Sequence, residues 1–293
     1  MGADRYLTVV ESVAREKRRE LRTLLTRNVP LLIAYSGGVD STFLLAEATA
    51  TLGDRVLGII ADSPSLPRSS LSSALATAES FGANVEIVAT AELSDPRYSS
   101  NPVNRCYFCK LELFTKMQKV AVERGFAALA YGENADDAFQ IRPGARAAQE
   151  FRVLAPLRIA GLTKAEIRFL SQQNGLPTAD SPAQPCLSSR IPHGTAVTSD
   201  ALAMIERAEE YVRSLGFKIF RVRYLARPED VPVAKLQIDP EEMDKVPARE
   251  NAIRAALLAF GFRDLVIDPD GYRAPAPSGS INIYFDPTAS LSY

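Results

Sequence analysis

Apolar residues occur along the first half of the chain in short runs, and amphipathic stretches separate these runs. The runs have the length and composition of buried strands and cover residues 31–35, 56–61, 85–89 and 126–131. The stretches between them have helical spacing and cover residues 41–52, 69–81 and 110–124. Almost wholly apolar strands that alternate with helices are typical of a parallel sheet covered on both faces. The pattern therefore predicts an α/β fold with a doubly wound parallel sheet.

Further predicted elements flank this sheet. Residues 5–27 predict a broken amphipathic helix before the first strand, and residues 163–174 predict a helix that closes the sheet domain. Regular structure is then interrupted by a proline-rich segment, residues 176–192, which predicts a linker. We therefore expect one domain over residues 1–175 and a second over residues 176–293.

The second half of the chain predicts a smaller α/β domain. Its expected helices cover residues 199–215 and 241–260, and its expected strands cover residues 218–225, 233–238, 265–267 and 281–285. Residues 274–280 predict a turn between the last two strands.

Charge and hydropathy exclude several classes of protein. The 293 residues include 34 Lys and Arg against 35 Asp and Glu, so the net charge of −1 argues against a protein that holds nucleic acid by a basic field. No apolar run approaches the roughly 18 residues that a membrane helix needs. The first residues also lack the apolar core and cleavage site of a signal peptide. We expect a cytoplasmic protein that does not bind a membrane and is unlikely to bind nucleic acid.

One hexapeptide stands directly between a predicted strand and a predicted helix. It consists of Ser36, Gly37, Gly38, Val39, Asp40 and Ser41. Two glycines allow a tight turn whose N–H groups point inward, and the positive end of the following helix favours a phosphate group there. A plain glycine turn with Ser and Asp as helix caps is the alternative. The lysine of the Walker motif is absent, which argues against an ordinary P-loop ATPase.

Polar residues also follow the second and fourth predicted strands. Asp62 and Ser63 end the second strand, and Gly132, Asp136 and Asp137 follow the fourth. Paired carboxylates at the carboxyl ends of parallel strands suit a hard cation such as Mg²⁺, and a solvated acidic turn is the alternative.

The chain has three cysteines and one histidine. Cys106 and Cys109 form a C-x-x-C pair, Cys186 lies far along the chain, and His193 is the only imidazole. Zinc on three cysteines and His193, a redox pair and packed thiols are all possible. Three cysteines without a fourth ligand would instead leave one iron of a [4Fe–4S] cluster open.

The hexapeptide at residues 36–41 resembles the pyrophosphate loop of the PP-loop ATP pyrophosphatases, which cleave ATP between its α- and β-phosphates. Residues 101–110, 132–137, 142–146 and 186–194 together resemble the LarE family of ATP-dependent sulfur transferases. The resemblance implies that ATP, with Mg²⁺, adenylates a carboxylate of pyridinium-3,5-dicarboxylic acid mononucleotide and that sulfur then displaces AMP. The product would be a thiocarboxylate for the nickel-pincer nucleotide cofactor.

The resemblance also assigns roles to the motifs. Asp62 and Ser63 would contact the adenosine, the 36–41 loop and Gly132 the phosphates, and Asp136 and Asp137 the Mg²⁺. One kind of LarE protein sacrifices the sulfur of a cysteine that matches Cys186. The other kind holds a [4Fe–4S] cluster on three cysteines. Because this chain has Cys106, Cys109 and Cys186, it resembles the second kind and would need a sulfide donor; we expect these cysteines and Asp40 to be catalytic.

The second predicted domain should bind the substrate nucleotide. Arg221 and Arg223 lie two residues apart on a predicted strand and therefore share a face, on which both can bind one phosphate. A solvated strand face is the alternative. The resemblance adds Arg190, Glu209 and Asp239 as expected substrate-binding residues. It makes His193 a neutral substitution in a turn.

The resemblance further implies a homo-oligomer, since the members of this family often form hexamers. Two other functions stay open. A tRNA thiolase of the same superfamily is the first, although additional C-x-x-C pairs are absent. A non-enzymatic ATP-binding iron–sulfur sensor is the second.

Overall fold

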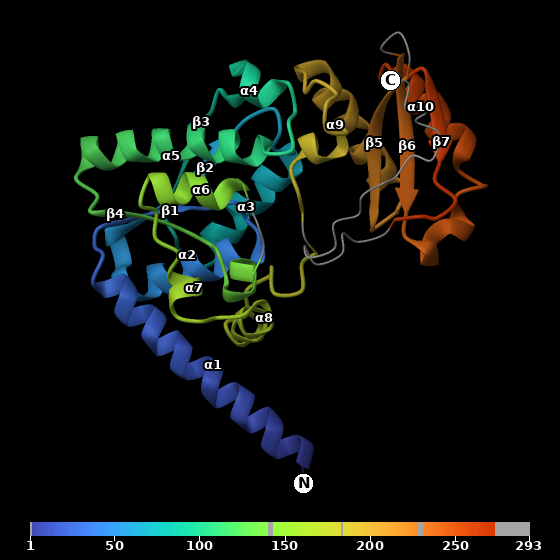
Figure 1. The fold of residues 1–293 in the computed structure, drawn as a ribbon. Coiled ribbons are helices and arrows are strands. Elements are labelled where there is room, and N and C mark those ends of the chain that lie inside the picture. The colour runs from blue at the N-terminus through green and yellow to red at the C-terminus, as the bar shows by residue number, and fades with distance from the viewer. Residues whose placement is uncertain (1, 140–142, 183, 228–230, 273–293) are drawn as a thin grey trace, which may run out of the picture.

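The computed structural model describes residues 2–139, 143–182, 184–227 and 231–272 (Figure 1). Four parallel strands form the first sheet, with bounds β1 (Leu31–Ala34), β2 (Val56–Asp62), β3 (Val85–Ala89) and β4 (Ala128–Tyr131). The strand order is β3-β2-β1-β4. Because β4 lies on the opposite side of β1 from β2 and β3, the direction of winding reverses between β1 and β4. The carboxyl ends of these two strands therefore form the crevice where doubly wound sheets bind ligands.

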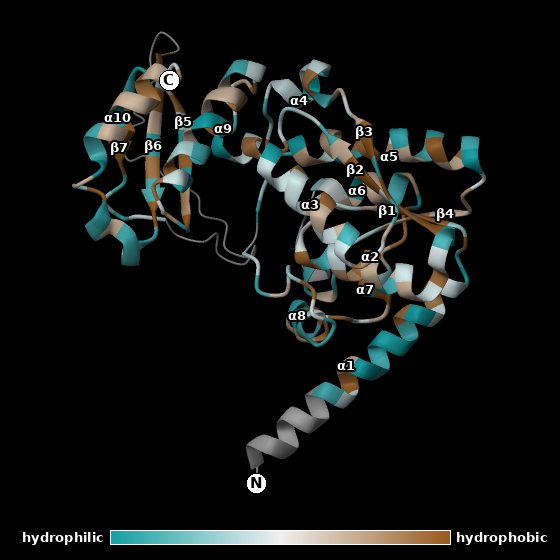
Figure 2. Ribbon diagram, turned by 180° about the vertical axis from the view of Figure 1, so that it is seen from behind, coloured by the Kyte–Doolittle hydropathy of each residue, from teal (hydrophilic) through white to brown (hydrophobic). Residues whose placement is uncertain are grey.

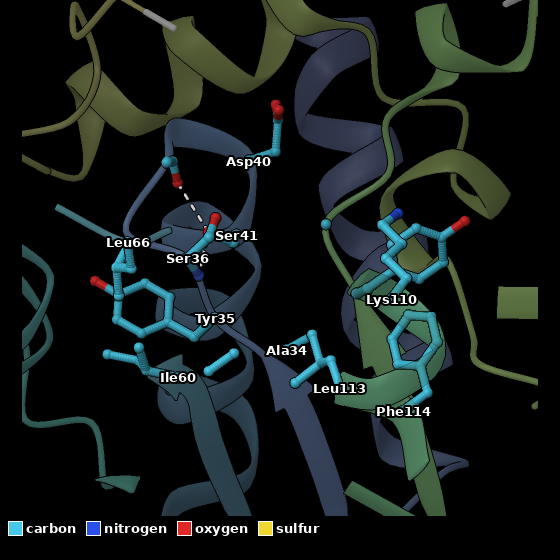
Figure 3. A pocket seen from close by; sticks show the side chains of 14 residues that line it. Ala34, Tyr35, Ser36, Asp40, Ser41, Ile60, Leu66, Lys110, Leu113 and Phe114 are labelled. Carbon is cyan, nitrogen blue, oxygen red and sulfur yellow. Dashed lines mark hydrogen bonds between the residues drawn. The ribbon is translucent and has the colours of Figure 1, made fainter. Parts of the chain in front are cut away.

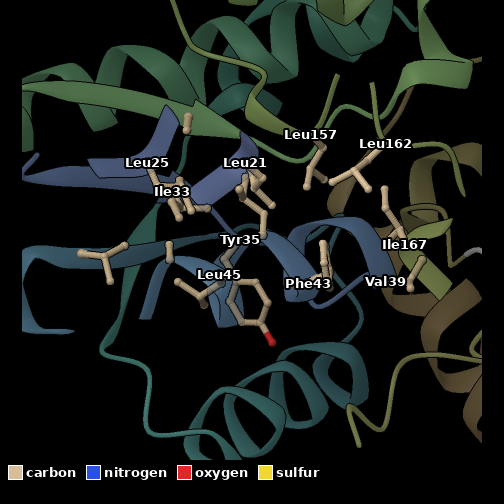
Figure 4. Packing of buried hydrophobic residues seen from close by; sticks show 14 of the residues in the cluster. Leu21, Leu25, Ile33, Tyr35, Val39, Phe43, Leu45, Leu157, Leu162 and Ile167 are labelled. Carbon is tan, nitrogen blue, oxygen red and sulfur yellow. The ribbon is translucent and has the colours of Figure 1, made fainter. Parts of the chain in front are cut away.

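Helices cover both faces of this sheet. One face carries α1 (Gly2–Thr26), α2 (Val39–Leu52), α3 (Arg68–Ser80), α7 (Pro156–Ile159) and α8 (Lys164–Gln173). The other face carries α5 (Arg105–Arg124) and α6 (Pro143–Glu150). Strand β1 shows the alternation directly: Leu31 and Ile33 pack into the first cluster (Figure 4), and Leu32 packs into the second. The predicted doubly wound α/β class is therefore confirmed.

A buried carboxylate of α2 binds α1 through hydrogen bonds. Glu47 of α2 accepts hydrogen bonds from Arg18 Nη2 at 2.6 Å, from Arg22 Nε at 2.8 Å and from Asn174 Nδ2 at 2.9 Å. Burial opposes the charge of Glu47, but the bonds from Arg18, Arg22 and Asn174 outweigh it and lower the pKa of this carboxyl. The long first helix is thus anchored by its charges as well as by its apolar side.

A smaller second sheet contains β5 (Phe220–Arg227), β6 (Val231–Ile238) and β7 (Asp264–Ile267). Strands β5 and β6 are antiparallel, and β6 and β7 are parallel. Its apolar residues pack on α9 (Ser199–Ser214) and α10 (Glu250–Ala259), which lie beside the sheet in Figure 2. The same cluster includes Tyr98 of α4 (Pro96–Ser99). The boundary between residues 175 and 176 stays a prediction.

Short 3₁₀ helices complete the described structure. They are η1 (Gly53–Arg55), η2 (Glu92–Ser94), η3 (Ala135–Phe139), η4 (Leu187–Arg190) and η6 (Pro240–Lys245). Among the described residues, no helix has both the length and the apolar character needed to cross a membrane.

Several predicted elements differ from the structure. The continuous helix expected over residues 241–260 is wrong, because η6 and α10 are separate and Pro247 stands between them, where it cannot join a helix interior. The first helix is continuous rather than broken. Helix α5 begins at Arg105 instead of Lys110, so Cys106 and Cys109 both lie in its first turns. The expected turn at 274–280 and strand at 281–285 lie outside the described residues.

Candidate active site

The predicted phosphate loop, residues 36–41, turns from β1 into α2. Gly37 has a φ of 73°, and a Cβ on it would lie 2.7 Å from the Cβ of Ala74, so only glycine fits. Ser41 Oγ lies 3.1 Å from Ser36 Oγ and 3.2 Å from the backbone N of Ser36 (Figure 3). Gly38 is the N-cap of α2 and supplies no side chain to cap it. The first N–H groups of this helix are therefore available to an anion.

A cavity of about 260 Å³ opens beside this loop, at the carboxyl ends of β1, β2 and β4 (Figure 3). Five of the predicted ATP-binding residues line it: Ser36, Gly38, Asp40, Ser41 and Gly132. Its remaining wall is mostly apolar and includes Tyr35, Ile60 and Phe114. An apolar cavity with hydrogen-bond donors at one end suits a nucleoside with attached phosphates.

Gly132 brings β4 against the phosphate loop. A Cβ on Gly132 would lie 2.8 Å from the backbone N of Ser41. The close approach of two backbones thus explains a glycine at this position.

Lysine 164 joins the loop to the region after β4. Its Nζ lies 2.6 Å from Asp40 Oδ2, and its backbone N donates to Asp136 Oδ2 at 2.8 Å. Asp40 Oδ1 is buried and has no hydrogen-bond partner. The pairing of Lys164 with Asp40 has no local signal in the sequence, because 124 residues separate the two.

The remaining predicted ATP-binding residues lie outside the lining of this cavity. Asp62 pairs with Arg68 at 2.7 Å, and Ser63 is buried and accepts from the backbone N of Ser65. Asp137 bonds to Asn134 and faces a different cavity, so it diverges from Asp136. Their predicted roles stay predictions.

Lys110 is a further residue at the cavity. Its Nζ lies 4.4 Å from the centre of the Tyr131 ring, and its stem packs on Gly144. Lys110 lines the cavity together with the phosphate loop. Its place at the end of the C-x-x-C segment was the only sequence signal.

The three cysteines occupy two segments. Cys106 is exposed, whereas Cys109 and Cys186 are half-buried. Burial raises the pKa of the Cys109 thiol, and the nearby charges of Glu92, Cys186 and Cys106 raise it further. Within the described residues, however, no three His, Cys, Asp or Glu side chains form a group that could hold a metal ion. The cysteines thus share a neighbourhood but are not arranged as a preformed ligand set.

Three buried hydroxyl groups fix the segment that follows Cys186. The oxygens of Ser65, Tyr98 and Ser188 lie 2.7 Å from one another in a closed ring. The backbone N of Leu187 also donates to Ser65 O at 2.9 Å. Three separate parts of the chain are joined here, and the ring holds Cys186 beside the end of β2.

Asn101 holds the rest of this segment. Its side chain is fully buried, and its Nδ2 donates to Pro192 O at 2.8 Å, Thr195 O at 2.9 Å and Ile191 O at 3.3 Å. Arg105 bonds to Asn101 Oδ1 and, at 2.9 Å, to Ser188 O. Residues 188–195 are therefore tied to the start of α5.

The predicted substrate-binding arginines gather near η4. Arg190 forms two hydrogen bonds to Glu209, at 2.9 and 3.0 Å, and Glu209 also accepts from Val222 N at 3.1 Å. Burial, and then the charge of Arg190, lower the pKa of both Arg221 and Arg223. Like charges held together in this way favour an anion as ligand.

A cavity of about 340 Å³ opens beside this cluster. Arg105, Arg190, Arg223 and His193 line it, and Arg223 is held there by Gln237 Oε1 and Ser189 O. Asp239 does not line it and caps η6, where it accepts from Glu241 N at 3.0 Å. The substrate role of Asp239 stays a prediction.

A third cavity, of about 470 Å³, lies on the other side of the phosphate loop. It runs between α3 and residues 177–186, and Cys186 lies at its border. Ser36, Gly38 and Leu66 line both this groove and the apolar cavity, so the two meet at the loop.

Comparison with known proteins identifies the family to which this chain belongs. No model of a known protein family matches the chain. The chain is 31% identical over 243 residues to pyridinium-3,5-bisthiocarboxylic acid mononucleotide synthase of Lactiplantibacillus plantarum, and the match covers 83% of this chain and 86% of the relative. This chain belongs to the LarE family.

Other relatives span the same length. An uncharacterised protein of Synechocystis sp. is 40% identical over 86% of this chain and 91% of its own. An uncharacterised protein of Methanocaldococcus jannaschii is 27% identical over 85% of this chain and 92% of its own.

Proposed function

We propose that this chain is an ATP-dependent sulfur transferase that converts a carboxylate of pyridinium-3,5-dicarboxylic acid mononucleotide into a thiocarboxylate. The observation that carries the proposal is the shared border of the cavities: the phosphate loop separates the apolar cavity from the groove that reaches Cys186. Membership of the LarE family supports the choice of substrate, because the Lactiplantibacillus plantarum relative is named for the bisthiocarboxylate of the same mononucleotide.

The first step forms an acyl-adenylate. A carboxylate oxygen of the substrate attacks the α-phosphorus of ATP, and the bond from this phosphorus to the oxygen that bridges to the β-phosphorus breaks. Pyrophosphate leaves with that electron pair. The N–H groups at the start of α2 and the hydroxyls of Ser36 and Ser41 stabilise the charge that develops on it.

The second step transfers sulfur. A sulfur nucleophile attacks the acyl carbon, the carbon–oxygen bond to the phosphate breaks, and AMP leaves. Adenylation is needed because an unactivated carboxylate has no good leaving group. Cys186, at the border of the groove, lies where this nucleophile must arrive.

Mg²⁺ would enter with ATP. Asp40 fits it, because the buried Oδ1 of Asp40 has no protein partner and Oδ2 faces a cation already. When bound, the ion would neutralise charge on the leaving pyrophosphate.

The iron–sulfur cluster fits less well. Three cysteine sulfurs are the ligands that a [4Fe–4S] cluster with an open iron requires, but the described cysteines do not form such a group. We keep the cluster as a proposal that iron analysis decides. Anaerobically reconstituted protein should be brown and hold about four irons per chain. A colourless, iron-free protein that transfers sulfur once and becomes lighter by one H₂S would show that Cys186 is consumed instead.

Pyrophosphate release tests the function itself. The protein should release pyrophosphate from ATP only when the pyridinium dicarboxylate mononucleotide is present. Asp40→Ala and Ser41→Ala should abolish this release, whereas Asp54→Ala, which changes an exposed carboxylate in η1, should not. Release that requires tRNA would identify a thiolase, and ATP binding without any release would identify a sensor.

The quaternary structure is part of the proposal. We propose a homo-oligomer, with six copies as the resemblance implies. Light scattering of the purified full chain tests this, and a monomer at all concentrations would contradict it.

A further inference from the structure

The groove that reaches Cys186 has an unusual lining. None of the described residues that line it carries a charge, although the cavity on the other side of η4 is rich in arginine. Hydroxyl groups line it instead. They belong to Ser36, Ser70, Ser73, Thr77, Thr178 and Ser181.

One wall of the groove is a helix face. Ser70, Ser73 and Thr77 stand three and four residues apart on α3, so their side chains project from the same side of the helix. Between them Ala74 contacts Gly37 of the phosphate loop. The hydroxyl-bearing face therefore continues the floor of the phosphate loop toward Cys186.

The opposite wall supplies an unpaired hydroxyl. Thr178 is only 7% exposed, and its Oγ1 has no hydrogen-bond partner. A buried polar group without a partner destabilises a protein, and a side chain that lines the groove can gain a partner from a bound ligand. Valine has the same shape and would avoid the cost.

We propose that this groove is the acyl site, which holds the substrate's reacting carboxylate between the phosphate loop and Cys186 through the hydroxyls of Ser73 and Thr178. The inference rests on the proposed function and names the residues that select a carboxylate. Neutral donors can bind a carboxylate without pairing it with a cation. A carboxylate bound in this way keeps more of its nucleophilic character toward the α-phosphorus than one paired with an arginine.

The position of the groove satisfies both steps of the reaction. The reacting carbon must lie near the α-phosphate when the acyl-adenylate forms and near sulfur when AMP leaves. Only a site that touches the phosphate loop and Cys186 meets both demands, and the groove touches both. The arginine-lined cavity includes Ser189 and Arg190 of η4, which begins directly after Cys186, so this cavity can hold the substrate's phosphate.

The test uses Thr178→Val and Ser73→Ala in the full-length protein. Ser72→Ala is the matched control, because Ser72 is an exposed neighbour on α3 that does not line the groove. Thr178→Val should raise the unfolding midpoint, since it removes the unpaired hydroxyl, and should lower kcat/KM for the pyridinium substrate about tenfold. ATP affinity should not change. A residue with a purely structural role would not move stability and activity in opposite directions.

A binding measurement separates this inference from the proposed function. Pyridine-3,5-dicarboxylate is the probe, and calorimetry should show that Ser73→Ala and Thr178→Val weaken its binding while Ser72→Ala does not. Normal kcat/KM and normal probe binding in both groove variants would overturn the acyl site and leave the function standing. Weakened binding of pyrophosphate instead of the probe would also overturn it, because the groove would then hold the leaving group. Weakened probe binding in a protein that never releases pyrophosphate would support the site and refute the reaction.

Discussion

Lys164 Nζ lies 2.6 Å from Asp40 Oδ2, and this ion pair joins the first turn of α8 to the first turn of α2. The pair lies at the edge of the apolar cavity, where the phosphates of ATP would arrive. Lys164 therefore compensates the negative charge of Asp40, and under the proposed function it also places a positive charge where the phosphates would bind.

Lys164→Met should weaken the binding of Mg²⁺–ATP about tenfold or more, because it removes a positive charge that would lie beside the phosphates. Lys164→Arg should retain most of the affinity. Calorimetric titration with Mg²⁺–ATP measures both, and Lys119→Met on the exposed side of α5 is the control. Equal affinity in all variants would show that the pair only fastens α8.

Arg223→Ala should raise the KM for the pyridinium mononucleotide by about ten- to a hundredfold and leave ATP affinity near normal, because a charge-assisted bond to the substrate's phosphate is lost. Arg221→Ala should act in the same direction. Steady-state kinetics measure the effect, with the exposed Arg263→Ala as control. If neither variant changes the KM, the two arginines serve the fold of β5 alone.

Cys106 and Cys109 should differ in reactivity in the metal-free protein. Burial raises the pKa of Cys109, so this thiol stays protonated at pH 8, and only the thiolate attacks an alkylating reagent. Cys106 is exposed and should react first. Mass spectrometry of peptides after brief treatment with iodoacetamide distinguishes them. Equal labelling would contradict the burial of Cys109.

Glu47→Gln should lower the free energy of unfolding by about 1.5–3 kcal/mol, because the charge-assisted hydrogen bonds from Arg18 and Arg22 are lost while both arginines keep contact with water. The pKa of Glu47 is lowered in the folded protein, so its stabilisation is present above pH 4.5 and is lost as the pH falls through the folded-state value. Urea unfolding at pH 7 measures the loss, with the exposed Glu79→Gln as control. The difference between wild type and Glu47→Gln should shrink in acid, and a constant difference would refute the assignment.

The sequence predicted the first sheet well because its strands are almost wholly apolar and most of its helices are long. It also located the turn at residues 36–41, since two glycines between a strand and a helix are a local signal; the phosphate-binding role of this turn stays a prediction. The short helices α4, α6 and α7 were missed, because four to eight residues carry little periodicity and depend on tertiary packing.

The parts of the site that were missed depend on distant contacts. Lys164 meets Asp40 only through the packing of α8 on α2, and the hydroxyl ring draws Ser65, Tyr98 and Ser188 from three parts of the chain. The place of Arg221 and Arg223 on one strand, β5, was predictable because a strand pattern is local in the sequence. The position of Arg190 close to both was not predictable, because it depends on the packing of η4 on β5.

Asn101 has a consequence for the chemical ageing of the protein. Its amide makes three hydrogen bonds as a donor, and deamidation would replace this donor with a carboxylate that repels the same carbonyl oxygens. Deamidation ordinarily begins when the backbone nitrogen of the next residue attacks the side-chain carbonyl. That residue is Pro102, which has no N–H to lose. The side chain on which residues 188–195 depend is thus followed by a residue that cannot start this cyclisation.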